Sequence, residues 1–352
     1  MPSANALLAG RYSLEARSPN LRHIRQAFFP GRSPGQAGFE FSLLPSRVHG
    51  PLRWRSTQTV GQNFKSDSKA RYSHRVKSID SQSNEEVDMG KIESRLVFPT
   101  LLHQAVGDRI LEYFSKIRTV DTVLAVNSCA RGQAVPESDL DFAILVQPAI
   151  TVEAIAAIER DWTIFSEADS KIKEYKAFSK FSHLHLDIIS GNYIPTPVEL
   201  GAPVDSFELE IGNQVRYSAP IRVAGRYFEE LQSRWLPYYG RELRLNRFEM
   251  MRTGCRYEID HIPLYVNRGL FFQAFDLLYR AFQKFLQVLF IGSAIYPIAY
   301  NKWIKYQIEE ILAKPELYNK LPPIISLSNI ESNEIIKKAE MLQYLLNQVE
   351  YV

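Results

Sequence analysis

Two aspartates separated by one residue are the side chains of this sequence best suited to chemistry. Asp139 and Asp141 lie in a segment whose other residues are largely apolar. Because side chains alternate between the two faces of a strand, we expect both carboxylates to point the same way. Two adjacent carboxylates repel each other, and a divalent cation such as Mg²⁺ removes that repulsion. The pair therefore indicates metal-assisted chemistry at a phosphate group.

A later segment, His183 to Ile189, repeats the same alternation. His183, His185 and Asp187 alternate there with leucine and isoleucine. If this strand lies beside the first, Asp187 completes a three-carboxylate site, and three carboxylates can hold two metal ions. Both histidines can face the site, but we expect them to be partly buried and hydrogen-bonded rather than to bind metal.

The loop before Asp139 carries groups suited to binding phosphate. Ser128 precedes Asp139 by eleven positions, and Gly132 lies between them. Backbone N–H groups and a hydroxyl in such a loop can bind the oxygens of a triphosphate. Arg131 can add a charge-assisted hydrogen bond, and a structural salt bridge is the alternative role for this side chain.

The run from Asn127 to Phe142 resembles the signature of the DNA polymerase β superfamily of nucleotidyltransferases, particularly its small bacterial members. That signature is Gly-Ser, about ten further residues, Asp-x-Asp, and a third aspartate on a later strand. The chain matches it at Ser128, Ala130, Arg131, Gly132, Ser138, Asp139, Asp141 and Asp187. The resemblance covers residues 98–190, and it departs at Asn127, where the family usually has glycine. Glycine permits a positive φ there, and asparagine is the most tolerant substitute, although activity could be reduced.

The resemblance implies a reaction and a role for each carboxylate. A nucleoside triphosphate, often ATP, binds with two Mg²⁺ ions, an acceptor hydroxyl attacks the α-phosphorus, and pyrophosphate leaves. Asp139 and Asp141 would bind both metals. Asp187 would bind the catalytic metal and help to deprotonate the acceptor.

The resemblance also implies a set of nucleotide-binding residues. Ser128 would contact the β- and γ-phosphates, with Asn127 and Arg131 beside it. In related two-domain enzymes a basic residue of the helical domain reaches the triphosphate, so Lys302 and Lys305 are candidates. These two lysines lie three residues apart on one face of an expected helix, and a solvated helix face is the alternative interpretation.

Three functions remain open at this level. The first is transfer of a nucleoside monophosphate to a small molecule, because the two-domain layout resembles that of aminoglycoside-type nucleotidyltransferases. The second is AMPylation of a protein, as in antitoxin-like members. The third is a catalytically weak nucleotide-binding module, which only Asn127 supports. A formal net charge of +3 is too small to argue for a nucleic-acid partner.

Apolar periodicity predicts the elements that position these residues. Residues 98–117 repeat apolar side chains at helical spacing, and Thr151 is a suitable N-cap for a helix that ends near Ala168. Strands are predicted over residues 121–126, 139–146 and 183–189, with 207–211 as a candidate fourth strand. Further helices are predicted over residues 226–236, 241–260, 268–291, 300–313 and 332–349. The fold class is α+β, with a polymerase β-like α/β domain and mixed sheet over 90–215 and a helical domain over 216–352.

The first 88 residues differ in composition from the rest of the chain. They are rich in arginine, serine, glycine and proline, and only Glu15 and Glu40 are acidic before Asp67. A disordered tail, an organelle transit peptide, and a translation start assigned upstream of Met89 are the three interpretations, of which we favour disorder or the start at Met89. The most apolar stretch, Phe285 to Tyr300, is too short and interrupted to span a membrane. We expect a cytoplasmic protein.

Overall fold

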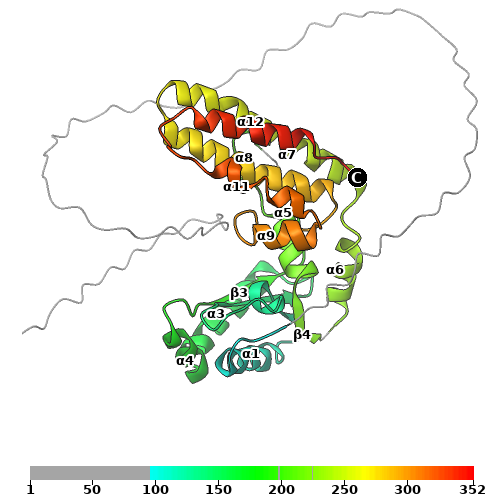
Figure 1. The fold of residues 1–352 in the computed structure, drawn as a ribbon. Coiled ribbons are helices and arrows are strands. Elements are labelled where there is room, and N and C mark those ends of the chain that lie inside the picture. Colours follow the sequence, from blue (N-terminus) through cyan, green and yellow to red (C-terminus); the bar gives the residue numbers. More distant parts are fainter. Residues whose placement is uncertain (1–95, 197–198, 224) are drawn as a thin grey trace, which may run out of the picture. The chain divides into compact units, whose positions relative to one another are not determined.

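The computed structural model describes residues 96–196, 199–223 and 225–352. This part of the chain has an α+β fold, as predicted, with a mixed four-stranded sheet and a larger set of helices (Figure 1). The segment of residues 1–88, and with it the three interpretations of that segment, lies outside the described residues. Within the described ranges, no helix combines the length and the apolar character needed to cross a membrane.

The sheet has the strand order β3-β2-β1-β4. Its strands are β1 (Val120–Ala125), β2 (Leu140–Val146), β3 (Leu184–Ile189) and β4 (Ala219–Val223). The central strand β1 is antiparallel to both β2 and β4, whereas β2 and β3 are parallel. The three strands predicted over residues 121–126, 139–146 and 183–189 are therefore confirmed.

One face of the sheet is covered by helices α1 (Leu101–Phe114), α3 (Val152–Ala168) and α4 (Ser170–Phe178) (Figure 1). Their apolar residues pack against one set of alternating strand side chains. Val106, Ile110, Phe114, Trp162 and Ile172 contribute from the helices, and Leu140, Phe142 and Ile144 contribute from β2. The side chain of Thr151 accepts a hydrogen bond from the amide of Ala154, which confirms the predicted N-cap.

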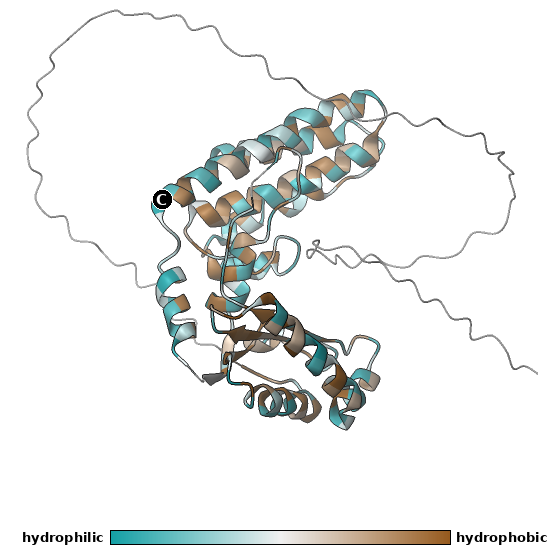
Figure 2. Ribbon diagram, turned by 180° about the vertical axis from the view of Figure 1, so that it is seen from behind, coloured by the Kyte–Doolittle hydropathy of each residue, from teal (hydrophilic) through white to brown (hydrophobic). Residues whose placement is uncertain are grey.

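The other face of the sheet packs against segments that come later in the chain. Leu124, Ala143 and Leu145 point to this side and share a core with aromatic side chains. These include Phe207, Phe228, Trp235, Tyr238, Tyr239 and Tyr296. Figure 2 shows that the strands between the two layers are strongly hydrophobic, as expected for a sheet covered on both faces.

The fourth strand of the sheet is not the one predicted. Residues 207–211 form helix α5 (Phe207–Ile211), which continues into the π-helical turn Gly212–Arg216. The alternation of apolar and acidic residues in this segment also fits a helix, because Phe207 and Ile211 are four residues apart and both are buried. The strand beside β1 is instead β4, beyond the predicted domain boundary at residue 215. Helix α4 was not predicted.

The remaining chain is mainly helical. Helices α7 (Arg241–Asn267) and α8 (Phe271–Gly292) pack along each other, and α12 (Glu334–Asn347) lies against both (Figure 1). Smaller elements are α6 (Tyr227–Trp235), α9 (Ile304–Tyr306), the π-helical turn Gln307–Ile311, α10 (Pro315–Tyr318) and α11 (Pro322–Ile325). The helix predicted over residues 300–313 begins only at Ile304, because Trp303 has a left-handed backbone with φ 60°.

Buried ion pairs hold this helical part together. Arg247 on α7 donates to both carboxylate oxygens of Glu208 at 2.6 and 2.7 Å, and also to Asp205 at 2.7 and 3.0 Å. Gln287 on α8 donates to the same two carboxylates at 2.9 Å. This network joins the segment around α5 to the helices behind it.

Candidate metal centre

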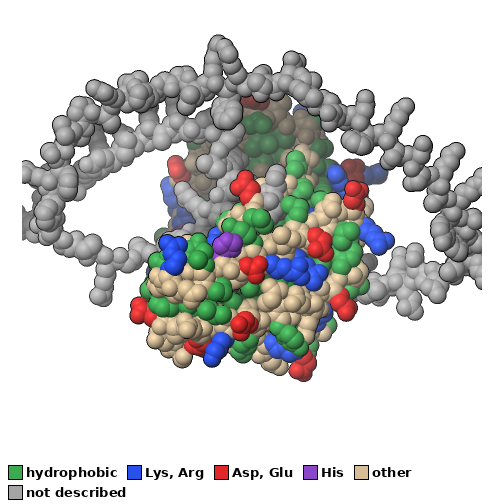
Figure 3. Space-filling model, turned by 90° about the horizontal axis from the view of Figure 1, so that it is seen from above, with side chains coloured by type: hydrophobic (Ala, Val, Ile, Leu, Met, Phe, Trp, Pro, Cys, Tyr) green, Lys and Arg blue, Asp and Glu red, His purple; other side chains and the backbone are tan. Residues whose placement is uncertain are grey.

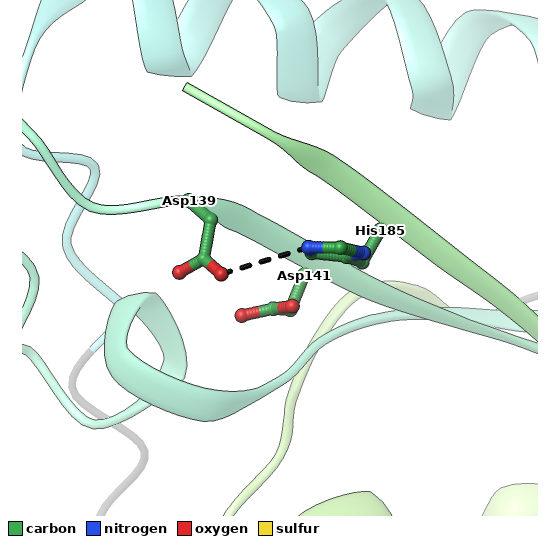
Figure 4. A group of neighbouring side chains, drawn as sticks. All are labelled: Asp139, Asp141 and His185. Atoms are coloured by element: carbon green, nitrogen blue, oxygen red, sulfur yellow. Dashed lines mark ion pairs between the residues drawn. The ribbon is translucent and has the colours of Figure 1, made fainter. Parts of the chain in front are cut away.

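Asp139, Asp141 and His185 converge at the edge where β2 and β3 begin (Figure 4). The parallel register places Asp141 beside His185. One carboxylate oxygen of each aspartate and one ring nitrogen of His185 all lie within 4.8 Å of one another. His185 Nε2 lies 3.7 Å from Asp139 Oδ2.

The alternation of the two strands explains why these groups share a face. Leu140 and Phe142 on β2 and Leu184 on β3 are directed into the core formed with α1, α3 and α4. Their neighbours Asp141 and His185 must then point to the opposite side of the sheet. The apolar side chains therefore orient the polar ones.

Asp141 lies in an environment that disfavours its charged form. Burial, followed by the charge of Asp139, raises the pKa of Asp141 to about 6. A hydrogen bond from the side chain of Asn127 and the charges of His185 and Lys302 act in the opposite direction. A divalent cation bound beside both carboxylates would remove the repulsion that Asp139 causes.

Asn127 adopts the backbone conformation for which the family resemblance would require glycine. Its φ is 58°, in the left-handed region. Asparagine tolerates this region better than most residues. Its side chain also hydrogen-bonds the Asp141 carboxylate, a contact that glycine cannot make and that the sequence did not indicate.

Two buried side chains that the sequence analysis missed hold the backbone just before Asp139. The ring of His103 donates from Nε2 to the Ser138 carbonyl at 3.1 Å, and Thr100 bonds to its Nδ1 at 2.7 Å. The hydroxyl of Tyr175 lies 3.1 Å from the same carbonyl and 3.3 Å from the carbonyl of His183. Both strands of the centre are thus anchored where they begin. The sequence could have indicated a buried role for His103, because this residue lies on the apolar face of the predicted helix that became α1.

Arg131 lies close to the centre without an ionic partner. Its Nε donates to Gln133 at 3.1 Å and its Nη1 to Asn213 at 3.4 Å. Burial lowers its pKa, and the charge of Asp141 is among the influences that raise it. The salt bridge considered as the alternative role is not formed with any carboxylate in the described part of the chain. The role of Arg131 as a phosphate-binding residue remains a prediction.

The two candidate lysines differ in position. The charge of Lys302 lowers the pKa of Asp141, so this lysine lies within electrostatic reach of the centre. Lys305 is 4.0 Å from Glu309 and lies over the ring of Tyr318. Both line a pocket of about 520 Å³ together with Asn301, Trp303, Ile304, Tyr306, Glu309, Glu310 and Tyr318. Lys302 is therefore the lysine that the structure links to the metal centre.

Ser128 and Cys129 occupy the short helix α2 (Asn127–Ala130). Ser128 is partly exposed and hydrogen-bonds the thiol of Cys129. Burial and the nearby charge of Asp141 raise the pKa of Cys129 to about 12, so the thiol stays protonated at neutral pH. Cys129 therefore acts as a buried packing residue of the core beneath the sheet.

The predicted third carboxylate, Asp187, is exposed and lies beside Ala143 in the strand register. That position is two residues beyond the row of Asp141 and His185, and Asp187 is not part of the converging group. Its role as a metal ligand remains a prediction. The structure brings His185 to the centre, although the sequence analysis did not expect a histidine to bind metal. Two carboxylates and an imidazole nitrogen are a donor set that fits a divalent cation.

The chain matches no protein-family model and no curated protein sequence. Among solved structures it is similar to a nucleotidyltransferase-like protein from Exiguobacterium sibiricum, with 11% sequence identity and a TM-score of 0.34. The matched region covers 69% of this chain and 74% of that protein.

Proposed function

We propose that this protein transfers a nucleoside monophosphate from a nucleoside triphosphate, most simply AMP from ATP, to an acceptor hydroxyl and releases pyrophosphate. The observation that supports this most directly is the convergence of Asp139, Asp141 and His185 on one face of two parallel strands. Arg131 and Lys302 lie within electrostatic reach of the Asp141 carboxylate. Acidic groups that bind cations and basic groups that bind phosphate are the two requirements of phosphoryl transfer.

In this proposal the acidic residues bind cations and the basic residues bind the triphosphate. Asp139 and Asp141 would hold the divalent cations, taken as Mg²⁺ from the family resemblance, and bound cations would stabilise the negative charge on the phosphate oxygens. Arg131 and Lys302 would orient the triphosphate through charge-assisted hydrogen bonds, with the hydroxyl of Ser128 beside them. Asp187, exposed on the same strand face, is available to accept the proton of the attacking hydroxyl.

A small-molecule acceptor is favoured by the surroundings of the centre. The pocket of about 520 Å³ contains Lys302, whose charge acts on Asp141, and Tyr306, which acts on the pKa of Arg131. A pocket of this volume accommodates a small molecule. On the face that Figure 3 shows, Lys and Arg side chains are interspersed with Asp and Glu, a distribution that does not favour a nucleic-acid acceptor. The positive φ of Asn127 weakens the case for an inactive binding module.

Label transfer from α-labelled ATP tests this proposal. The full chain is incubated with Mg²⁺ and fractionated cell extract, and the small-molecule, protein and RNA fractions are counted separately. Wild-type protein should label the small-molecule fraction, and Asp139→Asn should not. The matched control is Asp161→Asn, the same change at an exposed position on α3, which covers the opposite face of the sheet.

The location of the label decides between the acceptors. Label in the protein fraction that requires Asp139 would replace the small-molecule acceptor with a protein acceptor. Label in no fraction with any of the four nucleotides, while calorimetry detects nucleotide binding, would contradict the transferase proposal.

A further inference from the structure

We propose that His185 is the third protein ligand of the metal centre, and that its nitrogen makes the centre select a transition-metal dication of the Zn²⁺ and Co²⁺ type over Mg²⁺. The inference deepens the proposed function, since it concerns the cation at the same carboxylates. The sequence pattern predicts three carboxylates, which would favour Mg²⁺. The structure places two carboxylates and one imidazole together instead.

The spacing of the three donor atoms fits one shared cation. Ligand atoms that bind an octahedral cation at about 2.1 Å lie about 3 to 4.3 Å from one another. His185 Nε2 and Asp139 Oδ2 are 3.7 Å apart, and all three donors lie within 4.8 Å. In Figure 4 the imidazole of His185 lies beside both carboxylate groups. Small side-chain adjustments would bring all three donors to one ion.

The side chain of His185 is available for this role. It is 60% exposed, and its polar contact is with Asp139, which is 45% exposed. Among the residues that the structure describes, the imidazole makes no hydrogen bond that a cation would have to break. Exposure on the strand surface also leaves room for the water or phosphate oxygens that complete a coordination shell.

Asp187 lies one row further along β3 than His185 and is not part of the converging group. It pairs with Ala143, whereas His185 pairs with Asp141. Two residues of a parallel strand span about 6.6 Å, so the Asp187 backbone lies one full repeat further from Asp139. The imidazole of His185 starts in the same row as Asp141, and its Nε2 reaches to 3.7 Å from Asp139 Oδ2.

The donor set has a consequence for metal choice. Mg²⁺ takes oxygen ligands and keeps several waters, so a nitrogen ligand adds little to its affinity. Imidazole is a favourable ligand for Zn²⁺ and neighbouring transition metals, whose affinities for a given site rise along the first row. A transition-metal ion would therefore occupy the Asp-Asp-His group, and Mg²⁺ would enter with the triphosphate, whose oxygens it prefers.

Metal titration without nucleotide tests the inference independently of catalysis. The chelator-treated full chain is titrated with Co²⁺ and, separately, with Mg²⁺, by calorimetry and by the visible absorption of bound Co²⁺. Wild type should bind Co²⁺ more tightly than Mg²⁺. His185→Ala should weaken Co²⁺ binding by at least about tenfold, since even the loss of outer partners of a metal ligand costs 10–100-fold. Its Mg²⁺ affinity should change little.

Two further variants make the comparison decisive. His183→Ala is the matched control, because this exposed histidine lies on the same strand face with its ring 6.1 Å from that of His185. It should leave Co²⁺ affinity unchanged. Asp187→Asn tests the predicted carboxylate ligand. If Asp187→Asn weakens Co²⁺ binding and His185→Ala does not, the proposal is overturned in favour of a three-carboxylate site.

The remaining outcomes also decide the question. Equal affinity of the wild type for Co²⁺ and Mg²⁺ would overturn the proposal. If circular dichroism shows that His185→Ala fails to fold, His185→Asn replaces it with the same expected loss. Selective Co²⁺ binding that depends on His185, combined with no label transfer, would support this inference and reject the proposed transferase function alone.

Discussion

Asp141 illustrates, at the scale of one residue, how a candidate metal ligand opposes the stability of the metal-free fold. Its pKa is raised to about 6 by burial and by Asp139. A carboxyl group whose pKa is higher in the folded than in the unfolded chain stabilises the fold below its unfolded pKa, and this contribution is lost as the pH rises through the folded pKa. At neutral pH without metal, the ionised group therefore destabilises the protein.

We expect Asp141→Asn to raise the free energy of unfolding of the metal-free protein at pH 7. The upper bound is about 3 kcal/mol, from a shift of about two pKa units. The gain should disappear below about pH 4, because Asp141 of the wild type is then protonated in both the folded and the unfolded state. Urea denaturation in the presence of a chelator, at pH 7 and pH 4, measures both values. An equal gain at the two pH values would show that ionisation of Asp141 is not its cause.

Asn127 provides a second test at this scale, because the effect of its backbone conformation on stability can be measured separately from the effect of its side chain. In Asn127→Ala the backbone must keep a φ of 58°, which alanine adopts only with strain. We therefore expect the free energy of unfolding to fall by about 1–2 kcal/mol. Asn127→Gly relieves the backbone strain and should be tolerated better. Urea denaturation of the two variants side by side measures the difference. If glycine costs as much as alanine, the side-chain contact with Asp141, rather than the backbone, governs stability at this position.

At the scale of elements, the centre depends on how α1 and α4 hold the beginnings of β2 and β3. Tyr175 on α4 reaches the carbonyls of Ser138 and His183, one on each strand. These residues precede the row of Asp141 and His185, so the hydroxyl aligns the two strands where the candidate donors converge. His103 on α1 supports the same carbonyl of Ser138.

Tyr175→Phe removes only the hydroxyl, and we expect it to lower stability by about 1–2 kcal/mol, because buried carbonyls lose a hydrogen bond. Affinity for divalent metal should fall as well, since the strand beginnings are less firmly aligned. Denaturation and metal titration measure the two effects. Tyr344→Phe, the same change at a side chain that is exposed, is the control. Unchanged metal affinity in Tyr175→Phe would mean that the register is set without this hydroxyl.

At the scale of the described fold, buried charges connect distant segments. Arg247 pairs with Glu208 and Asp205, and Glu208 is fully buried. Tyr239 donates a further hydrogen bond of 2.6 Å to Glu208. The network ties α5, which also packs against the sheet, to α7 and α8.

Arg247→Met would leave two carboxylates without their cation, and we expect a loss of about 3–5 kcal/mol in the free energy of unfolding. Replacing both partners of a buried pair is far less costly than removing one, so the loss measures the unpaired charge. Urea denaturation gives the value, with Arg241→Met as the control, because Arg241 is exposed at the start of the same helix. A loss below about 1 kcal/mol, the size of a surface pair, would contradict this account.

The sequence by itself determined the local parts of this protein. The alternation in residues 139–146 and 183–189 predicted both strands, and it placed Asp139 and Asp141 on one face. The tolerance of asparagine for a positive φ was predicted for Asn127, and the N-cap was predicted for Thr151. Each of these depends on neighbouring residues alone, since strand alternation, capping and backbone preference are properties of short segments.

Only the tertiary structure decided which parts meet. Alternation puts His183, His185 and Asp187 on one face but does not say which of them lies beside Asp141, because register depends on packing across the whole sheet. The same limit applies to residues 207–211, whose pattern fits either a strand or a helix. The tertiary structure makes this segment a helix, in which the buried Glu208 pairs with Arg247. The limit applies equally to Lys302, whose position near the carboxylates depends on segments far apart in the chain.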